Sequence, residues 1–455
     1  MTFLLTNLPP HAHVHFIGIG GISMSGLAEI LMDRGFSVSG SDRAESHITK
    51  RLEGKGAKIY IGQCASNIQN PDVVVYSAAI SPDNPERIAA EKCGAAVFDR
   101  ATLMGAIMKL YKYPVAVAGT HGKTTTTSML THIALSAELD PTISLGGELP
   151  AIGGNIRVGG GDHFICEACE YHQSFLRFFP LVSIILNVEE DHLDYFRDLD
   201  HIKDTFRALA DLTPAGGATV INADDENTVD AVSGTSARMI TCSIKKEADY
   251  EARDISVSNS GTPSFTVYEK GTPLGTVTLS VHGMHNVSNA LCTVAAARFL
   301  GIDFEKIKNG LADFVGVGRR FEVKGEKNGV TVIDDYAHHP TEIAATLSTA
   351  KKTAKGSVFC IFQPHTYTRT KTLFSEFVNV LSGSSPIILD IYAAREKDTG
   401  LVSAKELADA IPDAVYLPTF EDCTAFLRET AKEGDMVLTM GAGDVYKIGE
   451  MFLQE

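Results

Sequence analysis

The chain has 455 residues, of which 44 % are apolar and 21 % are charged, and this size and composition indicate a globular protein with two or three domains. Acidic residues outnumber basic residues by 56 to 40, giving a formal charge of −16, which disfavours binding to nucleic acid or anionic membranes. The segment MTFLLTNLPP lacks the pattern of a signal peptide, and the apolar runs are too short to span a bilayer. We therefore expect a cytoplasmic protein, with neither nucleic acid nor membrane as a partner, whose eight cysteines are free thiols.

Strand patterns that end in Gly-rich or polar turns and lead into helical patterns recur along the chain. In order, VHFIGIGG precedes a helical pattern over residues 22–32, and PVAVAGTHG precedes one over residues 124–137. Later, GVTVIDDYAHH precedes a helical pattern over 340–352, and DMVLTMGAG precedes one over 444–453. This alternation predicts an α/β fold with parallel sheets and crossover helices.

The pattern divides into three predicted domains, residues 1–108, 109–316 and 317–455. The first ends in the helical pattern ATLMGAIMKLYK, before Pro114 opens a new strand. In the second, residues 236–282 alternate between apolar and polar side chains, which predicts an antiparallel portion beside the parallel sheet.

A glycine turn follows the first predicted strand, and an acidic residue, Asp42, closes the second. The glycines Gly18, Gly20 and Gly21 let backbone N–H groups approach a diphosphate, while an acid at this distance can bind a ribose. Ser23 stands where the dinucleotide-binding pattern has its third glycine. Three interpretations stay open on this motif alone: an NAD-dependent dehydrogenase, a tight turn without a ligand, and binding of another nucleotide such as a UDP-sugar.

A second glycine turn, GTHGKTTT, follows the apolar strand that begins at Pro114. Its backbone amides can cradle phosphates, the Lys123 ammonium can reach the β and γ oxygens, and the Thr124 hydroxyl can ligate Mg²⁺. The alternative is a Thr-rich helix cap. The candidate phosphate ligands are Gly119, Thr120, Gly122, Lys123, Thr124 and Thr125.

Two further apolar runs, FICEACEY and IILNVEEDH, end in acidic residues. Mg²⁺ between phosphates needs only one or two protein carboxylates, so Glu167 is the candidate ligand, and His192 is a candidate for a second cation or for phosphate. His11 and His13 are expected to be solvated residues of the terminal segment. A set of cations follows predicted strands in the last third of the chain and predicts a site for an anionic substrate: Arg319, Arg320, His338, His339, Arg369, Lys371 and Arg395.

Taken together, the segments GTHGKTTT, EACEY, NVEEDHLDYF, HNVSNA, GRRFE, DDYAHHPTEI, FQPHTYTRT and GAGD resemble the ATP-dependent Mur ligases of peptidoglycan synthesis. The resemblance covers nearly the whole chain in the right order. It implies a Rossmann-like UDP-sugar-binding domain over residues 1–108 and a central P-loop-type ATPase domain with a mixed sheet over 109–316. It also implies a C-terminal Rossmann-like domain over 317–455 that binds the amino acid.

The resemblance also implies roles for single residues. Lys123 would serve the phosphates, Thr124 and Glu167 would ligate Mg²⁺, and His192 would ligate a second Mg²⁺. Asn286 and Asn289 would hold the adenine, Arg320 would also contact the nucleotide, and Asp335 would hold the ribose, although the neighbouring Asp334 is an alternative. The implied UDP-sugar contacts are Gly18, Gly20, Ser23, Met24, Ser25, Asp42, Tyr336, His338 and Arg369. The implied catalytic residues are Lys123, His192, His338 and Arg369.

The opening HFIGIGGISMSGLAEIL with GSD is similar to family members that use ATP and Mg²⁺ to join L-alanine to UDP-N-acetylmuramate through an acyl phosphate. The implied partners are therefore small molecules, and the chain would act as a monomer or homodimer. Thr366 and Lys371 stand where many members have Arg, and Arg395 stands where Gly is common. The alternatives are a recycling ligase that adds a tripeptide, a nucleotide-binding regulator without turnover, and an NAD-dependent dehydrogenase.

Overall fold

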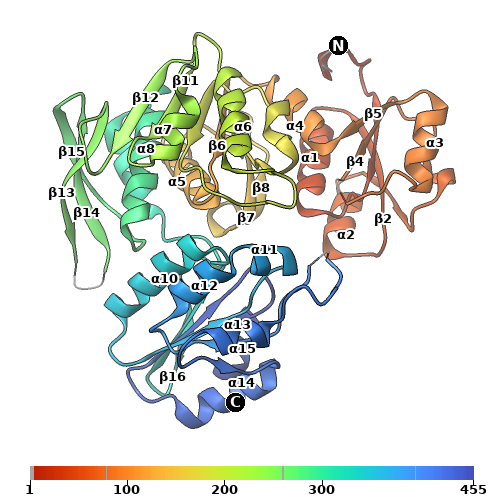
Figure 1. Ribbon diagram of the computed structural model, residues 1–455. Helices are drawn as coiled ribbons and strands as arrows, with labels where there is room; N and C mark the ends of the chain where they lie inside the picture. Colours follow the sequence, from red (N-terminus) through yellow and green to blue (C-terminus); the bar gives the residue numbers. More distant parts are fainter. Residues whose placement is uncertain (1–4, 78, 259–260, 395, 455) are drawn as a thin grey trace. The chain divides into compact units, whose positions relative to one another are not determined.

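The computed structural model describes residues 5–77, 79–258, 261–394 and 396–454. These residues form three β-sheets with helices between their strands (Figure 1), which confirms the predicted three-domain α/β class. By its internal contacts the chain divides into two compact units. The first comprises Met1–Glu189, Asp200–Tyr250 and Leu291–Gly310, and the second comprises Glu190–Leu199, Glu251–Ala290 and Leu311–Glu455. The domain boundaries at residues 108 and 316 stay predictions.

The first sheet has five parallel strands in the order β3-β2-β1-β4-β5. Its strands are β1 (His13–Ile17), β2 (Ser37–Asp42), β3 (Lys58–Ile61), β4 (Val73–Tyr76) and β5 (Ala96–Asp99). Its helices are η1 (Leu5–Asn7), α1 (Ile22–Asp33), α2 (His47–Gly54), η2 (Ala65–Asn67), α3 (Pro85–Cys93) and α4 (Arg100–Met108). The strand order reverses at β1, and ligands of such sheets bind outside the strand ends at this reversal. The glycine turn after β1 therefore lies where a nucleotide is expected.

The second sheet has ten strands in the order β15-β14-β13-β12-β11-β10-β6-β9-β7-β8. They are β6 (Tyr113–Ala118), β7 (Thr142–Leu149), β8 (Gly154–Arg157), β9 (His163–Glu167), β10 (Val182–Ile185), β11 (Ala218–Asn222), β12 (Met239–Ser243), β13 (Tyr250–Val257), β14 (Pro263–Glu269) and β15 (Thr272–Thr278). The predicted antiparallel portion is confirmed for the hairpin of β14 and β15 (Figure 1). It is wrong for β12, which pairs in parallel with β11 and so extends the parallel sheet.

The helices that accompany the second sheet are α5 (Lys123–Ser136), η3 (Pro150–Ile152), η4 (Tyr171–Arg177), α6 (Leu199–Asp211), α7 (Glu226–Val232), α8 (Met284–Phe299) and α9 (Phe304–Asp313). Across the described part of the chain, every helix is too short or too polar to cross a membrane. Helix α4 ends at Met108, four residues before the predicted end of its helical pattern. Pro114 keeps Tyr113 out of helical geometry, and Tyr113 already belongs to β6.

Helix α4 packs closely against η4 within the first compact unit. A Cβ atom added to Gly105 would lie 1.9 Å from the carbonyl oxygen of Arg177, a distance at which the backbone itself would have to move. Seven of the nine residues of α4 are buried. Most of the α4 side chains are therefore already packed, and larger side chains in their place would overpack the contact.

The third sheet has six strands in the order β16-β17-β21-β18-β19-β20, and β16 pairs antiparallel with β17 while the other pairs are parallel. They are β16 (Glu322–Lys327), β17 (Val330–Asp335), β18 (Val358–Phe362), β19 (Ile387–Ile388), β20 (Val415–Tyr416) and β21 (Met436–Met440). The helices are α10 (Pro340–Thr353), α11 (Tyr367–Thr372), α12 (Phe374–Leu381), α13 (Ala404–Ala410), α14 (Phe420–Thr430) and α15 (Tyr446–Leu453). Neighbouring strand residues such as Val437 and Leu438 enter two different apolar clusters, as expected when helices cover both faces of a sheet.

Candidate active site

The glycine turn after β1 is held by the end of β2. The N–H groups of Gly18 and Ile19 donate to the Ser41 carbonyl at 2.8 and 2.9 Å, and the Gly20 N–H donates to Asp42 Oδ2 at 2.8 Å. A Cβ atom on Gly20 would lie 2.7 Å from the same oxygen, so the turn needs glycine there. Asp42 therefore orients the turn, and its predicted contact with the UDP-sugar stays a prediction.

The other predicted residues of this turn lie at the start of α1. Met24 and Ser25 are buried, whereas Ser23 is partly exposed, and the Ser25 hydroxyl donates to the Ile22 carbonyl at 2.9 Å. Gly21 caps the helix without a side-chain hydrogen bond, which leaves backbone N–H groups for an anion. Any contact of Met24 or Ser25 with a ligand would thus involve the backbone.

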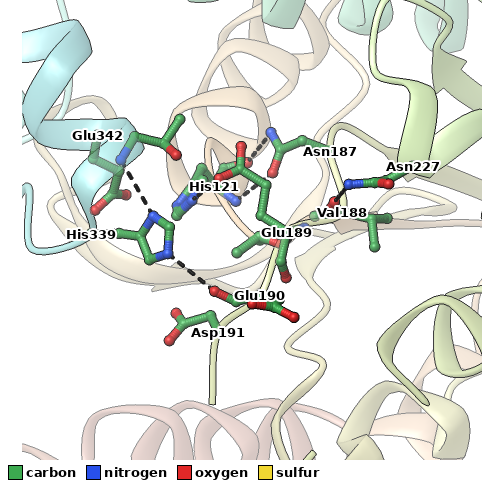
Figure 2. Close-up of polar contacts among 12 residues, drawn as sticks. His121, Asn187, Val188, Glu189, Glu190, Asp191, Asn227, His339 and Glu342 are labelled. Carbon is green, nitrogen blue, oxygen red and sulfur yellow. Dashed lines mark hydrogen bonds and ion pairs between the residues drawn. The ribbon is translucent and has the colours of Figure 1, made fainter. Parts of the chain in front are cut away.

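The predicted phosphate loop after β6 is the segment GTHGKTTT, residues 119–126. It is hydrogen-bonded to Asn187, a residue that the sequence analysis missed. The His121 N–H donates to Asn187 Oδ1 at 2.7 Å and the Asn187 amide donates back to the His121 carbonyl at 3.1 Å (Figure 2). The Thr120 N–H donates to the Asn187 carbonyl at 3.0 Å. Gly119 and Gly122 have φ of 143° and 84°, values that favour glycine. The sequence signal that could have indicated Asn187 was an amide residue just after β10, the strand that pairs with β6.

Lys123, the first residue of α5, is held in a polar pocket of the first compact unit. Its Nζ donates to the carbonyls of Gly119 and Thr120 at 2.5 and 2.9 Å and to the carboxylate of Glu170 at 3.1 and 3.2 Å. Burial by itself lowers the pKa of Lys123, but the carboxylates of Glu170 and Glu167 outweigh burial, so the pKa lies above its ordinary value. The lysine therefore stays charged, as phosphate binding requires.

Glu167 ends β9, and its Oε1 accepts from the Gly146 N–H of β7 at 2.7 Å. Carboxylates and hydroxyls, such as those of Thr124 and Thr125 at the start of α5, are hard oxygen donors, so these residue types fit Mg²⁺. Cys166 and Cys169 stand three residues apart on either side of Glu167. Burial raises the pKa of both thiols, that of Cys169 to about 11. They are free thiols without the low pKa of redox pairs.

In the second compact unit, Asn286 and Asn289 lie in the first turns of α8. Both are largely buried, and the Asn289 amide donates to Asn286 Oδ1 at 3.2 Å while the Asn286 amide donates to the His282 carbonyl at 2.7 Å. Arg320 pairs with Glu342 at 3.3 Å. The structure thus brings the two predicted adenine ligands together, and their role stays a prediction.

Asp335, at the end of β17, accepts backbone hydrogen bonds from two neighbouring loops. Its Oδ2 accepts from the Phe321 N–H at 2.8 Å and its Oδ1 from the Ala337 N–H at 2.7 Å, while burial raises its pKa to about 6. Asp334 instead bonds Thr439 at 2.7 Å and Arg319 at 3.0 Å. Both carboxylates are buried, so the choice of Asp335 over Asp334 as the ribose ligand stays a prediction.

A cationic cluster gathers around Arg369 of α11. Its guanidinium donates to Asp191 at 2.8 and 3.2 Å and contacts His365 Nδ1 at 3.0 Å. The rings of His338 and His365 lie 5.8 Å apart, and those of His338 and Tyr336 lie 5.4 Å apart. Three predicted residues, Tyr336, His338 and Arg369, are therefore brought together, with Asp191 and His365 as partners that the sequence analysis did not assign.

The same cluster has strongly shifted pKa values. Burial lowers the pKa of His338 to about 4, so the imidazole is neutral at neutral pH. Although burial opposes ionisation, Arg369 and the nearby histidines hold the pKa of Asp191 far below its ordinary range. His192 follows Asp191 with a left-handed φ of 53°, and its Nε2 lies 3.8 Å from Asp191 Oδ2. Its predicted role as a metal ligand is not contradicted by this placement and stays a prediction.

Other predicted cations have structural partners. Arg319 donates to the carbonyls of Gly441 and Gly443 at 2.8 and 2.9 Å, which fastens the GAGD turn. His339 caps α10, and its Nε2 lies 3.1 Å from the Glu190 carbonyl (Figure 2). Lys371 is exposed on α11, and Arg395 lies outside the described residues.

The prediction for one terminal histidine is wrong. His13 is the first residue of β1 rather than part of a solvated tail, and its Nε2 lies 2.7 Å from Ser39 Oγ. It pairs with β2 because the strand HVHFI begins one residue earlier than the expected strand pattern VHFIGIGG. His11 is exposed, as expected.

Three stretches of the chain match domains of one family. Residues 13–112 match the Mur ligase family catalytic domain, residues 117–297 the Mur ligase middle domain, and residues 319–443 the Mur ligase glutamate ligase domain. The chain belongs to the Mur ligase family. The phosphate loop of this Mur ligase and the strand that precedes it lie where the middle-domain match begins.

Relatives within the Mur ligase family match over nearly the full length. The UDP-N-acetylmuramate–L-alanine ligase of Acetivibrio thermocellus is 51 % identical over 449 residues, covering 97 % of this chain and 96 % of the relative. The ligase of the same name from Clostridium perfringens is 52 % identical over 446 residues, covering 97 % of each.

Solved structures of the family show the same architecture. The crystal structure of UDP-N-acetylmuramate–alanine ligase MurC from Thermotoga maritima matches with a TM-score of 0.79 at 30 % identity, covering 97 % of this chain and 98 % of that one. The murein peptide ligase of Psychrobacter arcticus matches with a TM-score of 0.71 at 27 % identity over the same shares.

Proposed function

We propose that the chain is a UDP-N-acetylmuramate–L-alanine ligase, which uses ATP to join L-alanine to the lactyl carboxylate of UDP-N-acetylmuramate in peptidoglycan synthesis. The observation that carries the proposal is the identity of 51 % and 52 % with ligases of that name over nearly the whole chain. The murein peptide ligase matches at only 27 % identity, so addition of a tripeptide is the weaker alternative. Membership of a ligase family leaves the dehydrogenase alternative without support.

In the proposed reaction, the lactyl carboxylate attacks the γ-phosphorus of ATP and forms an acyl phosphate while ADP leaves. The amine of L-alanine then attacks the acyl carbon, and phosphate leaves. Lys123 would neutralise charge on the transferred phosphoryl group, which is the main task of a protein in phosphoryl transfer. Mg²⁺, held by Thr124 and Glu167 with His192 at a second site, would supply further charge neutralisation.

The cluster around Arg369 is proposed to handle the acyl and amine groups. The Arg369 guanidinium suits a carboxylate or an acyl phosphate because it presents planar, paired donors. His338 is neutral, since its pKa is about 4, and it can accept a proton from the alanine ammonium when an approaching anion raises that pKa. Tyr336 would border the same substrate.

Phosphate release from ATP tests the proposal directly. Purified protein with UDP-N-acetylmuramate and Mg²⁺ is expected to release phosphate with L-alanine, and the assay compares glycine, L-serine and the tripeptide as acceptors. Release with the tripeptide alone would assign the recycling reaction instead. If no phosphate is released with any of these amines, the ligase proposal is refuted.

The expected setting follows from the substrates and the thiols. We propose a cytoplasmic enzyme with small-molecule partners, because all eight cysteines are free and free thiols suit a reducing compartment. Gel filtration with light scattering would decide between a monomer and a homodimer.

A further inference from the structure

Every hydrogen of the Lys123 ammonium has an acceptor inside the protein. Its Nζ lies 2.5 Å from the Gly119 carbonyl, 2.9 Å from the Thr120 carbonyl, and 3.1 and 3.2 Å from the two oxygens of Glu170. An ammonium has three hydrogens to donate. A phosphate that bonds to Lys123 must therefore replace one of these acceptors.

Glu170 is the acceptor that can be replaced. The two carbonyls belong to the backbone of the phosphate loop itself, whereas Glu170 reaches Lys123 from the segment after β9. Its side chain is only 3 % exposed, and in a buried ion pair the cost of desolvation nearly offsets the attraction. An anion that binds at Lys123 can consequently change whether Lys123 stays paired with Glu170.

The backbone that follows Glu170 is strained. His172 and Gln173 are successive residues with left-handed φ values of 54° and 52°, and the Gln173 N–H donates to the Glu170 carbonyl at 2.8 Å. Such a backbone conformation is unfavourable and persists where surrounding contacts impose it, as at functional sites. The tight turn fixes where the Glu170 side chain begins, directly beside the loop.

We propose that Glu170 is a positioning residue that holds Lys123 against the phosphate loop and yields it to the terminal phosphates of ATP. The inference rests on the proposed function and adds a residue to it. A ligand that bonds to Lys123 must first separate the lysine from Glu170, and the free energy of this separation opposes its binding. A ligand that does not reach Lys123 leaves the pair intact. The site thereby distinguishes ligands by whether their phosphates reach the lysine.

Neighbouring groups do not duplicate this role. Glu167 directs one oxygen to the Gly146 N–H at 2.7 Å and raises the pKa of Lys123 less than Glu170 does. Cys169 is a half-buried thiol whose pKa is raised to about 11, so it brings no negative charge at neutral pH. Glu170 is thus the carboxylate whose charge has the largest effect on the pKa of Lys123.

The decisive variant is Glu170→Gln, studied by isothermal titration calorimetry with ATP, tripolyphosphate and adenosine. We expect ATP and tripolyphosphate to bind about tenfold more tightly, a change of about 1.4 kcal/mol, because the variant no longer competes for Lys123. Adenosine has no phosphate and should bind as it does to the wild type. Loss of a merely structural contact would weaken binding, so an unchanged or weaker affinity for tripolyphosphate overturns the proposal.

Turnover gives a second readout. The KM for ATP should fall in Glu170→Gln while kcat also falls, because Lys123 is less firmly oriented; an unchanged or raised KM for ATP contradicts the proposal. Should this variant be poorly folded, Glu170→Asp keeps the charge but withdraws it from Nζ. It should also tighten tripolyphosphate binding, by a smaller factor, and no tightening counts against the role.

The matched control is Glu91→Gln on α3, which removes one exposed carboxylate of the first compact unit, paired with Arg87 rather than with Lys123. It should leave the affinity for tripolyphosphate without Mg²⁺ unchanged, and a tightening equal to that of Glu170→Gln would show a general charge effect and overturn the proposal. A wild type that binds no ATP would refute the proposed function itself. A wild type that binds ATP, with variants that do not bind it more tightly, refutes this inference alone.

Discussion

Lys123 is bonded to one buried carboxylate and two carbonyls of the phosphate loop, so its removal has two separable effects. Lys123→Ala should lower kcat/KM for ATP by about 10³-fold or more, because the charge on the transferred phosphoryl group is no longer neutralised. UDP-sugar binding should be nearly unchanged, since its predicted site is the separate glycine turn after β1. Phosphate release and calorimetry with UDP-N-acetylmuramate measure the two effects, and loss of both would argue against separate sites.

The low pKa of His338 links the cationic cluster to stability at acid pH. The folded pKa of about 4 lies below the ordinary value of about 6.5, so the folded protein binds fewer protons than the unfolded chain between these values. Stability from the neutral imidazole is therefore lost as the pH falls from 7 toward 4. Between pH 7 and 5, the wild type should lose roughly 1–2 kcal/mol more unfolding free energy than His338→Gln. Equal losses in urea titrations would contradict the shift.

Residues that are consecutive in the sequence could be assigned to a site beforehand, whereas partners across the fold could not. The phosphate loop is a single segment, so GTHGKTTT predicted the strand, the turn and the helix start together. Asn187 and Glu170 reach that loop from the segments after β10 and β9, and Asp191 meets Arg369 across 178 residues. Such partners depend on strand order, which local patterns do not determine.

The elements of the first sheet are joined by a buried carboxylate on α3. Glu86 is fully buried; it accepts from the Ser41 hydroxyl at 2.5 Å and from the Cys64 N–H at 3.1 Å, and also from the Asn67 amide. His15 Nε2 lies 3.5 Å away. Burial opposes ionisation, but these donors lower the pKa of Glu86 below its ordinary value. One helix residue thereby connects β1, β2 and η2 beneath the glycine turn.

Removing this carboxylate should destabilise the sheet. Glu86→Ala is expected to lower the free energy of unfolding by about 3 kcal/mol, because several buried donors lose their acceptor. Glu91 lies on the same helix and is 61 % exposed in a loose pair with Arg87, so Glu91→Ala should cost at most about 0.5 kcal/mol. Urea unfolding compares the two, and equal losses would show that the buried network has no special weight.

The strands and helices of α/β units were predictable where period and turn chemistry agreed, as for α5 after β6 and α10 after β17. Two elements were not. The end of α4 came earlier than Pro114 requires, and the parallel pairing of β12 depended on its neighbour β11 rather than on its own alternation. Pairing partners are a property of the whole sheet, so a strand pattern alone leaves the direction open.

At the scale of the molecule, substitution of Gly105 tests how closely α4 packs against η4 in the first compact unit. Gly105→Ala would place a methyl group 1.9 Å from the Arg177 carbonyl oxygen, so the unfolding free energy should fall by at least about 2 kcal/mol. Gly54 ends α2 with open space around its Cβ position, and Gly54→Ala should instead be neutral or raise stability by up to about 1 kcal/mol. Thermal unfolding of both variants checks the contrast; similar midpoints would refute it.

The close approach of α4 to η4 also bears on whether the first sheet is a detachable module. A fragment that stops at residue 108 keeps α4 but loses the chain segment containing Arg177, against which Gly105 packs. Part of a helix with seven buried residues would then face water, and exposed apolar patches of this kind promote aggregation. The N-terminal sheet is thus expected to need the following strands in order to remain monodisperse, so a boundary at residue 108, as predicted, would mark a change of sheet rather than a point of autonomous folding.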